Sequence, residues 1–172
     1  MILVTGATGD IGGEVVRQLV GAGEKVRVLA RDPAKAAKLG PAVEVAQGDL
    51  LQPETIAAAF TGAVKVFLMA GAQDLPTIAE HALAAAKRGG VRHVVLLSSS
   101  TTLTEPLVTI GKWHLAAEQQ LEATGIAWTM LRPGNYASNT LRWASTIKAQ
   151  CSRLLATARA RPSTLTTSPR SR

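Results

Sequence analysis

Glycines at three-residue spacing follow the first apolar residues of the chain, in the segment Val4-Thr5-Gly6-Ala7-Thr8-Gly9-Asp10-Ile11-Gly12-Gly13. A helix pattern begins within this segment, and the unpaired N–H groups at a helix start can bind a phosphate without any side chain. Gly6 suits the tight turn, Gly9 allows the backbone to approach a pyrophosphate, and Gly12 allows the helix to pack closely on the strand. The alternative is a purely structural turn, but glycines placed between a strand and a helix favour dinucleotide binding.

A second candidate for this chemistry is Arg31, which follows Ala30 at the end of the second apolar run. Domains that bind NAD through such a glycine turn usually place an acid there for the ribose 2′-hydroxyl, whereas an arginine suits a 2′-phosphate. We therefore predict that NADP(H) is preferred over NAD(H). Asp32 leaves two interpretations open, because it either caps a helix beginning at Pro33 or contacts a ribose.

Apolar periodicity alternates between strand and helix patterns along residues 1–131. Strands are predicted over residues 2–5, 25–30, 43–46, 64–70, 91–98 and 127–131, and helices over residues 11–21, 33–39, 53–60, 74–88 and 110–123. Strands that are apolar on both faces, with helices between them, indicate a parallel sheet covered on both sides. The fold class is therefore α/β, with a Rossmann-type doubly wound sheet in the strand order 3-2-1-4-5-6.

Composition limits the classes of function. A length of 172 residues suits one domain, and the aliphatic residues must form its core because only 3% of residues are aromatic. The single cysteine, Cys151, fits a reducing compartment. No signal peptide or membrane-length apolar run is visible, so a cytoplasmic location without a membrane partner is expected.

The net charge of +7 is unevenly distributed. Five arginines and no acid lie in residues 151–172, and residues 1–150 hold 14 basic and 12 acidic side chains. A near-neutral body does not indicate a specific nucleic-acid partner. We therefore predict a nucleotide-binding domain over residues 1–150 and a disordered or aberrant basic tail over residues 151–172.

Several segments together resemble the NmrA-like NAD(P)H-binding group of atypical short-chain dehydrogenases/reductases. The segments are residues 5–12, 28–33, 48–50, 90–99 and 121–134, and the resemblance extends to about residue 148. The most similar members look like quinone or azo-compound reductases, so the resemblance implies hydride transfer from NAD(P)H to a small electron acceptor.

The resemblance also implies which residues contact the cofactor. They are Gly6, Thr8, Gly9, Asp10, Ile11, Gly12, Arg31, Asp49, Leu50, Met69, Ala70, Gly71, Ser98, Pro133 and Asn135. Asp49 lies beside the adenine by resemblance, or is a turn residue before Pro53. Ser98 and Ser99 either line the substrate crevice or satisfy backbone groups of a turn.

Carbonyl-reducing members of the wider family use a Tyr-x-x-x-Lys pair, and the resemblance places Ile110 and His114 at these two positions. Isoleucine cannot transfer a proton, and the only tyrosine, Tyr136, follows the sixth strand. His114 is the best candidate for a proton donor or a contact to the cofactor ribose, and the alternative is a surface histidine on an amphipathic helix. His81 and His93 are interpreted as helix-surface and strand-start residues without metal-ligand spacing, so no metal site is predicted.

The resemblance implies a further strand and a small lobe that covers the substrate, and this lobe is expected to be incomplete here. The segment Pro162-Ser-Thr-Leu-Thr-Thr-Ser-Pro169 stands where a Pro-Ile-Asp-x-x-Asp-Ile-Ala-like segment is expected. Codons for that segment, read one base out of frame, encode the residues found. We therefore expect a frameshift near Gln150, which the gene's DNA sequence would test.

Three hypotheses of function follow from the sequence. The first is an NAD(P)H-dependent reductase of quinone-like or azo-like acceptors, and the second is an NADP-binding redox sensor without turnover. The third is an inactive truncated fragment. The sequence leaves the acceptor and the oligomeric state open.

Overall fold

The computed structural model describes residues 1–134 and 136, and residues 1–134 form one compact unit. Its strands are β1 Ile2–Val4, β2 Val26–Ala30, β3 Val43–Gln47, β4 Lys65–Leu68, β5 His93–Leu97 and β6 Ala127–Leu131. Its helices are α1 Asp10–Gly21, α2 Pro33–Ala36, α3 Ala57–Phe60, α4 Leu75–Arg88 and α5 Thr109–Glu122. The predicted basic tail and the predicted frameshift lie outside the described residues.

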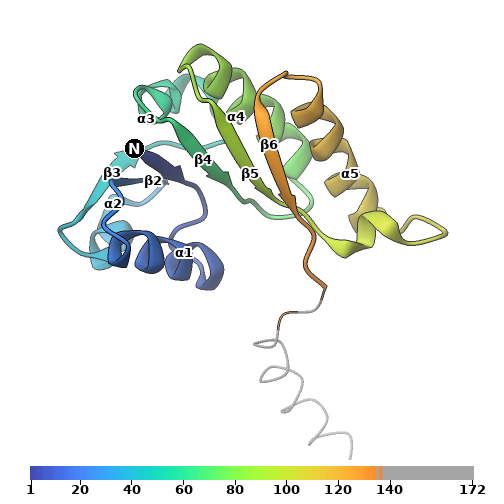
Figure 1. The fold of residues 1–172 in the computed structure, drawn as a ribbon, viewed down its shortest axis with the longest axis horizontal. Helices are drawn as coiled ribbons and strands as arrows, with labels where there is room; N and C mark the ends of the chain where they lie inside the picture. The colour runs from blue at the N-terminus through green and yellow to red at the C-terminus, as the bar shows by residue number, and fades with distance from the viewer. Residues whose placement is uncertain (135, 137–172) are drawn as a thin grey trace, which may run out of the picture. The chain divides into compact units, whose positions relative to one another are not determined.

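The six strands form one parallel sheet in the order β3-β2-β1-β4-β5-β6 (Figure 1). This confirms the predicted fold class and strand order. The order reverses at β1, which pairs with β2 on one side and with β4 on the other. Connections leave opposite faces of the sheet at such a point, so a crevice opens at the carboxyl ends of the strands.

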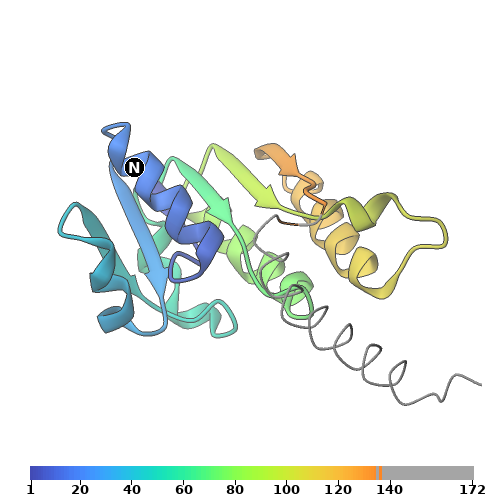
Figure 2. The same ribbon diagram turned by 90° about the horizontal axis from the view of Figure 1, so that it is seen from below.

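Strand alternation builds a hydrophobic core on each face of the sheet. Leu3 points into the cluster beneath α3, α4 and α5, while its neighbour Val4 joins the cluster that includes Val16 of α1 and Ala36 of α2. Figures 1 and 2 show α4 and α5 side by side, and the two helices contact each other extensively. Both faces are therefore covered, as the apolar strands predict.

Two predicted helices differ in detail from the structure. The segment predicted as one helix over residues 33–39 is α2 followed by the 3-10 helix Ala37–Leu39, and the segment predicted over residues 53–60 is the 3-10 helix Pro53–Thr55 followed by α3. The Thr55 hydroxyl donates to the Gln52 carbonyl at 2.8 Å and accepts the Asp49 N–H at 2.9 Å. These bonds hold the first turn against the preceding loop, and short 3-10 turns are common at helix ends.

The remaining differences are small. β4 ends at Leu68 and β5 begins at His93, so both strands are shorter than predicted. The 3-10 helix Ser100–Leu103 was not predicted; the Ser99 hydroxyl caps it by accepting the Thr101 N–H at 3.2 Å. None of the helices among the described residues is long and apolar enough to cross a membrane.

Candidate functional site

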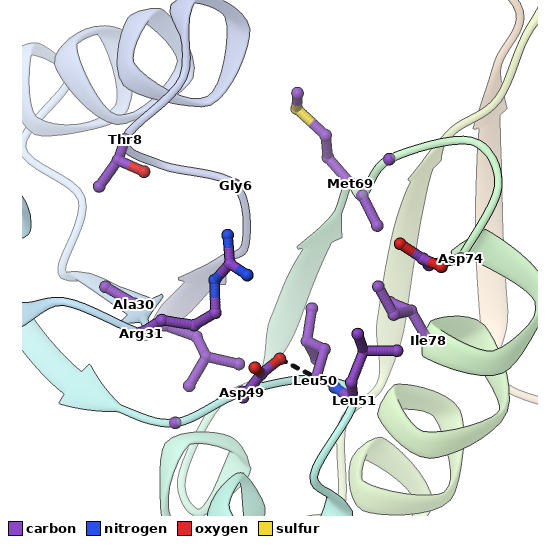
Figure 3. A pocket seen from close by; sticks show the side chains of 14 residues that line it. Gly6, Thr8, Ala30, Arg31, Asp49, Leu50, Leu51, Met69, Asp74 and Ile78 are labelled. Carbon is purple, nitrogen blue, oxygen red and sulfur yellow. Dashed lines mark hydrogen bonds between the residues drawn. The ribbon is translucent and has the colours of Figure 1, made fainter.

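A pocket of about 330 Å³ opens at the carboxyl ends of β1, β2, β3 and β4 (Figure 3). This position is the crevice in which doubly wound sheets bind ligands. The pocket is lined by Gly6, Thr8, Leu29, Ala30, Arg31, Gly48, Asp49, Leu50, Leu51, Met69, Ala70, Gly71, Asp74 and Ile78.

The turn between β1 and α1 requires glycine at two positions. Gly6 has a φ of +65°, which L side chains rarely adopt. A Cβ on Gly12 would lie 2.2 Å from the Gly6 carbonyl oxygen, so any side chain there would push α1 away from the turn. The predicted roles of Gly6 in the turn and of Gly12 in helix packing are therefore confirmed.

The start of α1 offers N–H groups to a ligand. Gly9 is the N-cap residue and supplies no side chain, and the N–H groups of the first helical turn have no partner inside the helix. Gly6 and Thr8 line the pocket, whereas Gly9, Asp10, Ile11 and Gly12 do not. Pyrophosphate binding by the latter four residues stays a prediction.

Arg31 and Asp32 have different surroundings although they are adjacent. Arg31 is exposed and lines the pocket (Figure 3). The Asp32 carboxylate accepts the N–H of Ala34 at 3.0 Å and that of Lys35 at 3.4 Å, which caps α2. The capping interpretation of Asp32 is confirmed, and Arg31 is the residue of the two that faces the pocket.

The residues after β4 are held to β1 by a buried threonine. The Met69 N–H donates to the Thr5 hydroxyl oxygen at 2.8 Å, and the same hydroxyl lies 2.8 Å from the Met69 carbonyl oxygen. Thr5 is fully buried, and both bonds are partly shielded from water. They fix Met69, and with it Ala70 and Gly71, on the wall of the pocket.

The loop after β3 forms another wall. The Asp49 carboxylate accepts the Leu51 N–H at 3.0 Å, the bond drawn in Figure 3. Gly48 packs so closely on the Thr55 carbonyl that a Cβ would lie 2.8 Å from its oxygen. Asp49 is thus a turn residue and also lines the pocket, so the two interpretations of this residue do not exclude each other.

The contribution of α4 to the pocket was not predicted from the sequence. Asp74, immediately before α4, and Ile78 within it line the pocket on the side opposite Arg31 (Figure 3). Both residues lie in the segment predicted as a helix over residues 74–88, and the apolar spacing of that segment gave no signal that one end of the helix borders a ligand site. An anionic ligand group is favoured near Arg31 and disfavoured near Asp74.

A second polar cluster lies at the carboxyl ends of β5 and β6. The buried Glu118 of α5 accepts the Ser98 hydroxyl at 2.5 Å and two N–H groups of Arg132 at 2.8 Å each. Burial raises the pKa of Glu118, but the bonds from Arg132 and Ser98 outweigh it and hold this pKa below 4.5. Ser98 therefore satisfies a buried carboxylate and does not line the pocket.

The structure places His114 inside the protein. His114 is only 8% exposed, and its ring nitrogen Nδ1 has no hydrogen-bond partner among residues 1–134 and 136. The surface interpretation of His114 is therefore wrong. Burial lowers its pKa from 6.5, only partly offset by the negative charge of Glu118, so the neutral imidazole predominates at pH 7. Ile110, one turn earlier, is 41% exposed.

The other predicted positions are less informative. The Pro133 carbonyl accepts the Ser100 N–H at 2.9 Å, and Asn135 lies outside the described residues. His93 begins β5 and contacts the Thr129 hydroxyl at 3.0 Å, as a strand-start residue. Within the described part of the chain, no three histidine, cysteine, aspartate or glutamate side chains are grouped to hold a metal ion.

A family model described as NAD(P)H-binding matches residues 6–150. The chain is 39% identical over 150 residues to an NAD(P)H azoreductase of Xenophilus azovorans, covering 86% of this chain and 52% of the relative. It is 31% identical over 146 residues to quinone oxidoreductase 2 of Escherichia coli, covering 82% of this chain and 51% of the relative. The chain thus spans about half the length of these relatives.

One solved structure with this fold is an NADPH-dependent quinone oxidoreductase of Escherichia coli in complex with NADPH. Its TM-score is 0.78 at 29% identity, over 85% of this chain and 53% of that one. A Citrobacter sp. triphenylmethane reductase in complex with NADP(H) has a TM-score of 0.74 at 30% identity, over 84% and 54% of the two chains.

Proposed function

Because the chain belongs to the NAD(P)H-binding, NmrA-like group of atypical short-chain dehydrogenases/reductases, we propose that its pocket binds NADP(H) in preference to NAD(H). We propose further that it acts as an NAD(P)H-dependent reductase of quinone-like or azo-like acceptors. The observation that carries the proposal is the shared pocket of Arg31 and the glycine turn at the start of α1.

The residues present fit the cofactor. The backbone at Gly6 is open to a ligand, the N–H groups at the start of α1 suit a pyrophosphate, and the Arg31 guanidinium suits a 2′-phosphate. Asp32 caps α2 and does not line the pocket, so Arg31 is the charged residue of this turn that faces the pocket. Bound NADPH would supply a hydride to an electron-poor acceptor.

His114 is the proposed proton donor for this reduction, and a contact to the cofactor ribose is its alternative role. A buried imidazole with a lowered pKa releases its proton more readily than an exposed one. If it donates the proton, NADPH oxidation falls as the pH rises above that lowered pKa. Steady-state rates from pH 5 to pH 8 would show this limb in the wild type and its absence in His114→Gln.

A titration of the chain with NADPH and NADH tests the cofactor directly. We expect saturable binding of both, with a lower Kd for NADPH. Arg31→Ala should weaken NADPH binding about tenfold to a hundredfold, the range for hydrogen bonds between charged groups, and leave NADH nearly unchanged. Arg88→Ala, an exposed arginine at the far end of α4, serves as the control for net charge. Unchanged discrimination in Arg31→Ala would refute the role of Arg31.

A second candidate function is an NADP-binding sensor that does not turn over. The observation that favours it is Ile110, an exposed apolar side chain at the position where carbonyl-reducing relatives carry a tyrosine. The two functions differ in one assay, NADPH oxidation at 340 nm with a quinone or an azo dye present. Saturable NADPH binding without oxidation would exclude the reductase and support the sensor.

A further inference from the structure

A hydrogen bond joins two walls of the pocket, which are helix α4 and the loop after β3 that contains Leu50. The His81 ring nitrogen Nδ1 lies 2.7 Å from the Leu50 carbonyl oxygen, across 31 residues of chain. Both the bond and His81 itself are partly buried. His81 is therefore more than the helix-surface residue that its sequence context predicts.

The position of His81 on α4 connects this bond to the pocket. Asp74, Ile78 and His81 are spaced by four and three residues and so lie along one side of the helix. The first two line the pocket, and Figure 3 shows Ile78 facing Leu50 and Leu51 of the loop after β3. His81 follows one turn later and holds the backbone of the same loop.

The chemistry of the bond fixes the state of the ring. A carbonyl oxygen only accepts hydrogen bonds, so Nδ1 must carry the proton. The neutral ring is then the tautomer that leaves Nε2 without a proton. Protonation of Nε2 leaves the Nδ1–H donor in place.

We infer that His81 is a positioning residue for the cofactor, setting the distance between α4 and the Asp49–Leu50 loop without touching the ligand. This inference rests on the proposed binding of NADP(H) in the pocket. Other bonds of the loop, such as Asp49 to Leu51 and Thr55 to Asp49, lie within the loop and its following turn. The His81 bond ties the loop to the opposite wall, so it acts on the width of the pocket.

The bond acts on the half of the dinucleotide that lies between these walls. Arg31, proposed to hold the 2′-phosphate, lines the same pocket, so this half is the adenosine bisphosphate. Removing the bond should weaken 2′,5′-ADP by the same factor as NADPH. It should leave the ratio of NADPH to NADH affinity unchanged, unlike Arg31→Ala.

A matched pair of variants separates the donor from the volume of the side chain. Asparagine places an N–H donor close to the position of Nδ1, and leucine has the same branching without a donor. We expect His81→Leu to raise the Kd of both NADPH and 2′,5′-ADP about twofold to tenfold, and His81→Asn to restore most of the affinity. His93→Leu is the control, since this histidine bonds to Thr129 at the amino end of the sheet, away from the pocket.

Isothermal titration of the wild type and the three variants, after a thermal melt of each, gives distinct outcomes. A wild type that binds neither probe overturns the proposed function itself. A wild type that binds while His81→Leu has the same Kd overturns the positioning role. Weak binding in both His81→Leu and His81→Asn assigns the effect to volume and overturns the role of the donor.

A measurement on the wild type covers the case in which His81→Leu does not fold. The ring ¹⁵N chemical shifts of His81, assigned by their loss in His81→Asn, report which nitrogen carries the proton. Protonated Nδ1 with unprotonated Nε2 in the neutral ring is the expected result. The opposite tautomer contradicts the bond and with it the inference.

Discussion

Glu118 shows how much a single buried side chain can organise. Its carboxylate comes from α5 and accepts hydrogen bonds from Ser98 after β5 and Arg132 after β6. The two strand ends are also joined directly, since the Ser98 N–H donates to the Leu131 carbonyl at 2.7 Å. One carboxylate therefore holds three elements at the carboxyl edge of the sheet.

We expect Glu118→Gln to lower the free energy of unfolding by about 1.5–3 kcal/mol, the range for hydrogen bonds to a charged group. The amide cannot accept both Arg132 bonds and the Ser98 bond as a carboxylate does. Urea unfolding at pH 7 measures the change.

Glu14→Gln is the matched control for that substitution. Glu14 also pairs with an arginine, Arg17, but both side chains lie on the exposed face of α1. Solvent screens such a pair, so its loss should change stability much less. Equal losses in the two variants would contradict the role given to burial of Glu118.

At the scale of elements, the turn from β1 into α1 depends on the absence of a side chain. Gly12 packs against the carbonyl of Gly6, and the Cβ of an alanine has no space there. Gly12→Ala should cost about 1–3 kcal/mol of stability, as overpacking does, and should abolish NADPH binding by displacing the start of α1. Thermal melts and the NADPH titration measure the two effects.

Gly21→Ala tests whether the effect belongs to the turn. Gly21 is the last residue of the same helix, and a Cβ there meets nothing within 4 Å. This variant should keep its stability and its NADPH affinity. A similar loss in both variants would show that α1 tolerates alanine poorly everywhere, independent of the contact at Gly6.

The elements that carry strong periodicity could be predicted from the sequence. The apolar runs gave all six strands and their order, and glycines between a strand and a helix identified the turn at Gly6. The contribution of α4 to the pocket could not be predicted, because Ile78 has the same apolar spacing as the other buried residues of this helix. The bond from His81 to Leu50 joins residues 31 apart, and no local pattern encodes such a contact.

At the scale of the whole molecule, stability should depend on pH in two steps. The pKa of His114 is lowered from 6.5 by burial, so the unfolded chain takes up its proton first as the pH falls. Stability present above pH 6.5 is therefore lost progressively toward the lowered pKa. The pKa of Glu118 is held below 4.5, so its contribution is present above that pH and is lost as the pH falls through the folded value.

Urea unfolding between pH 8 and pH 3.5 measures both steps. His114→Asn should remove the first decline, and Glu118→Gln should reduce the second. Stability that stays constant from pH 8 to pH 5 in the wild type would contradict the buried, neutral His114.

The cap on α2 has a consequence for how this pocket can change over evolutionary time. Asp32 caps the N-terminus of α2, so its replacement destabilises that helix, whereas the exposed Arg31 beside it has no such structural role among its described contacts. A lineage can therefore substitute residue 31 freely while selection for folding preserves residue 32. On the role proposed for Arg31, preference between the two nicotinamide coenzymes is then a trait that a single codon change can alter.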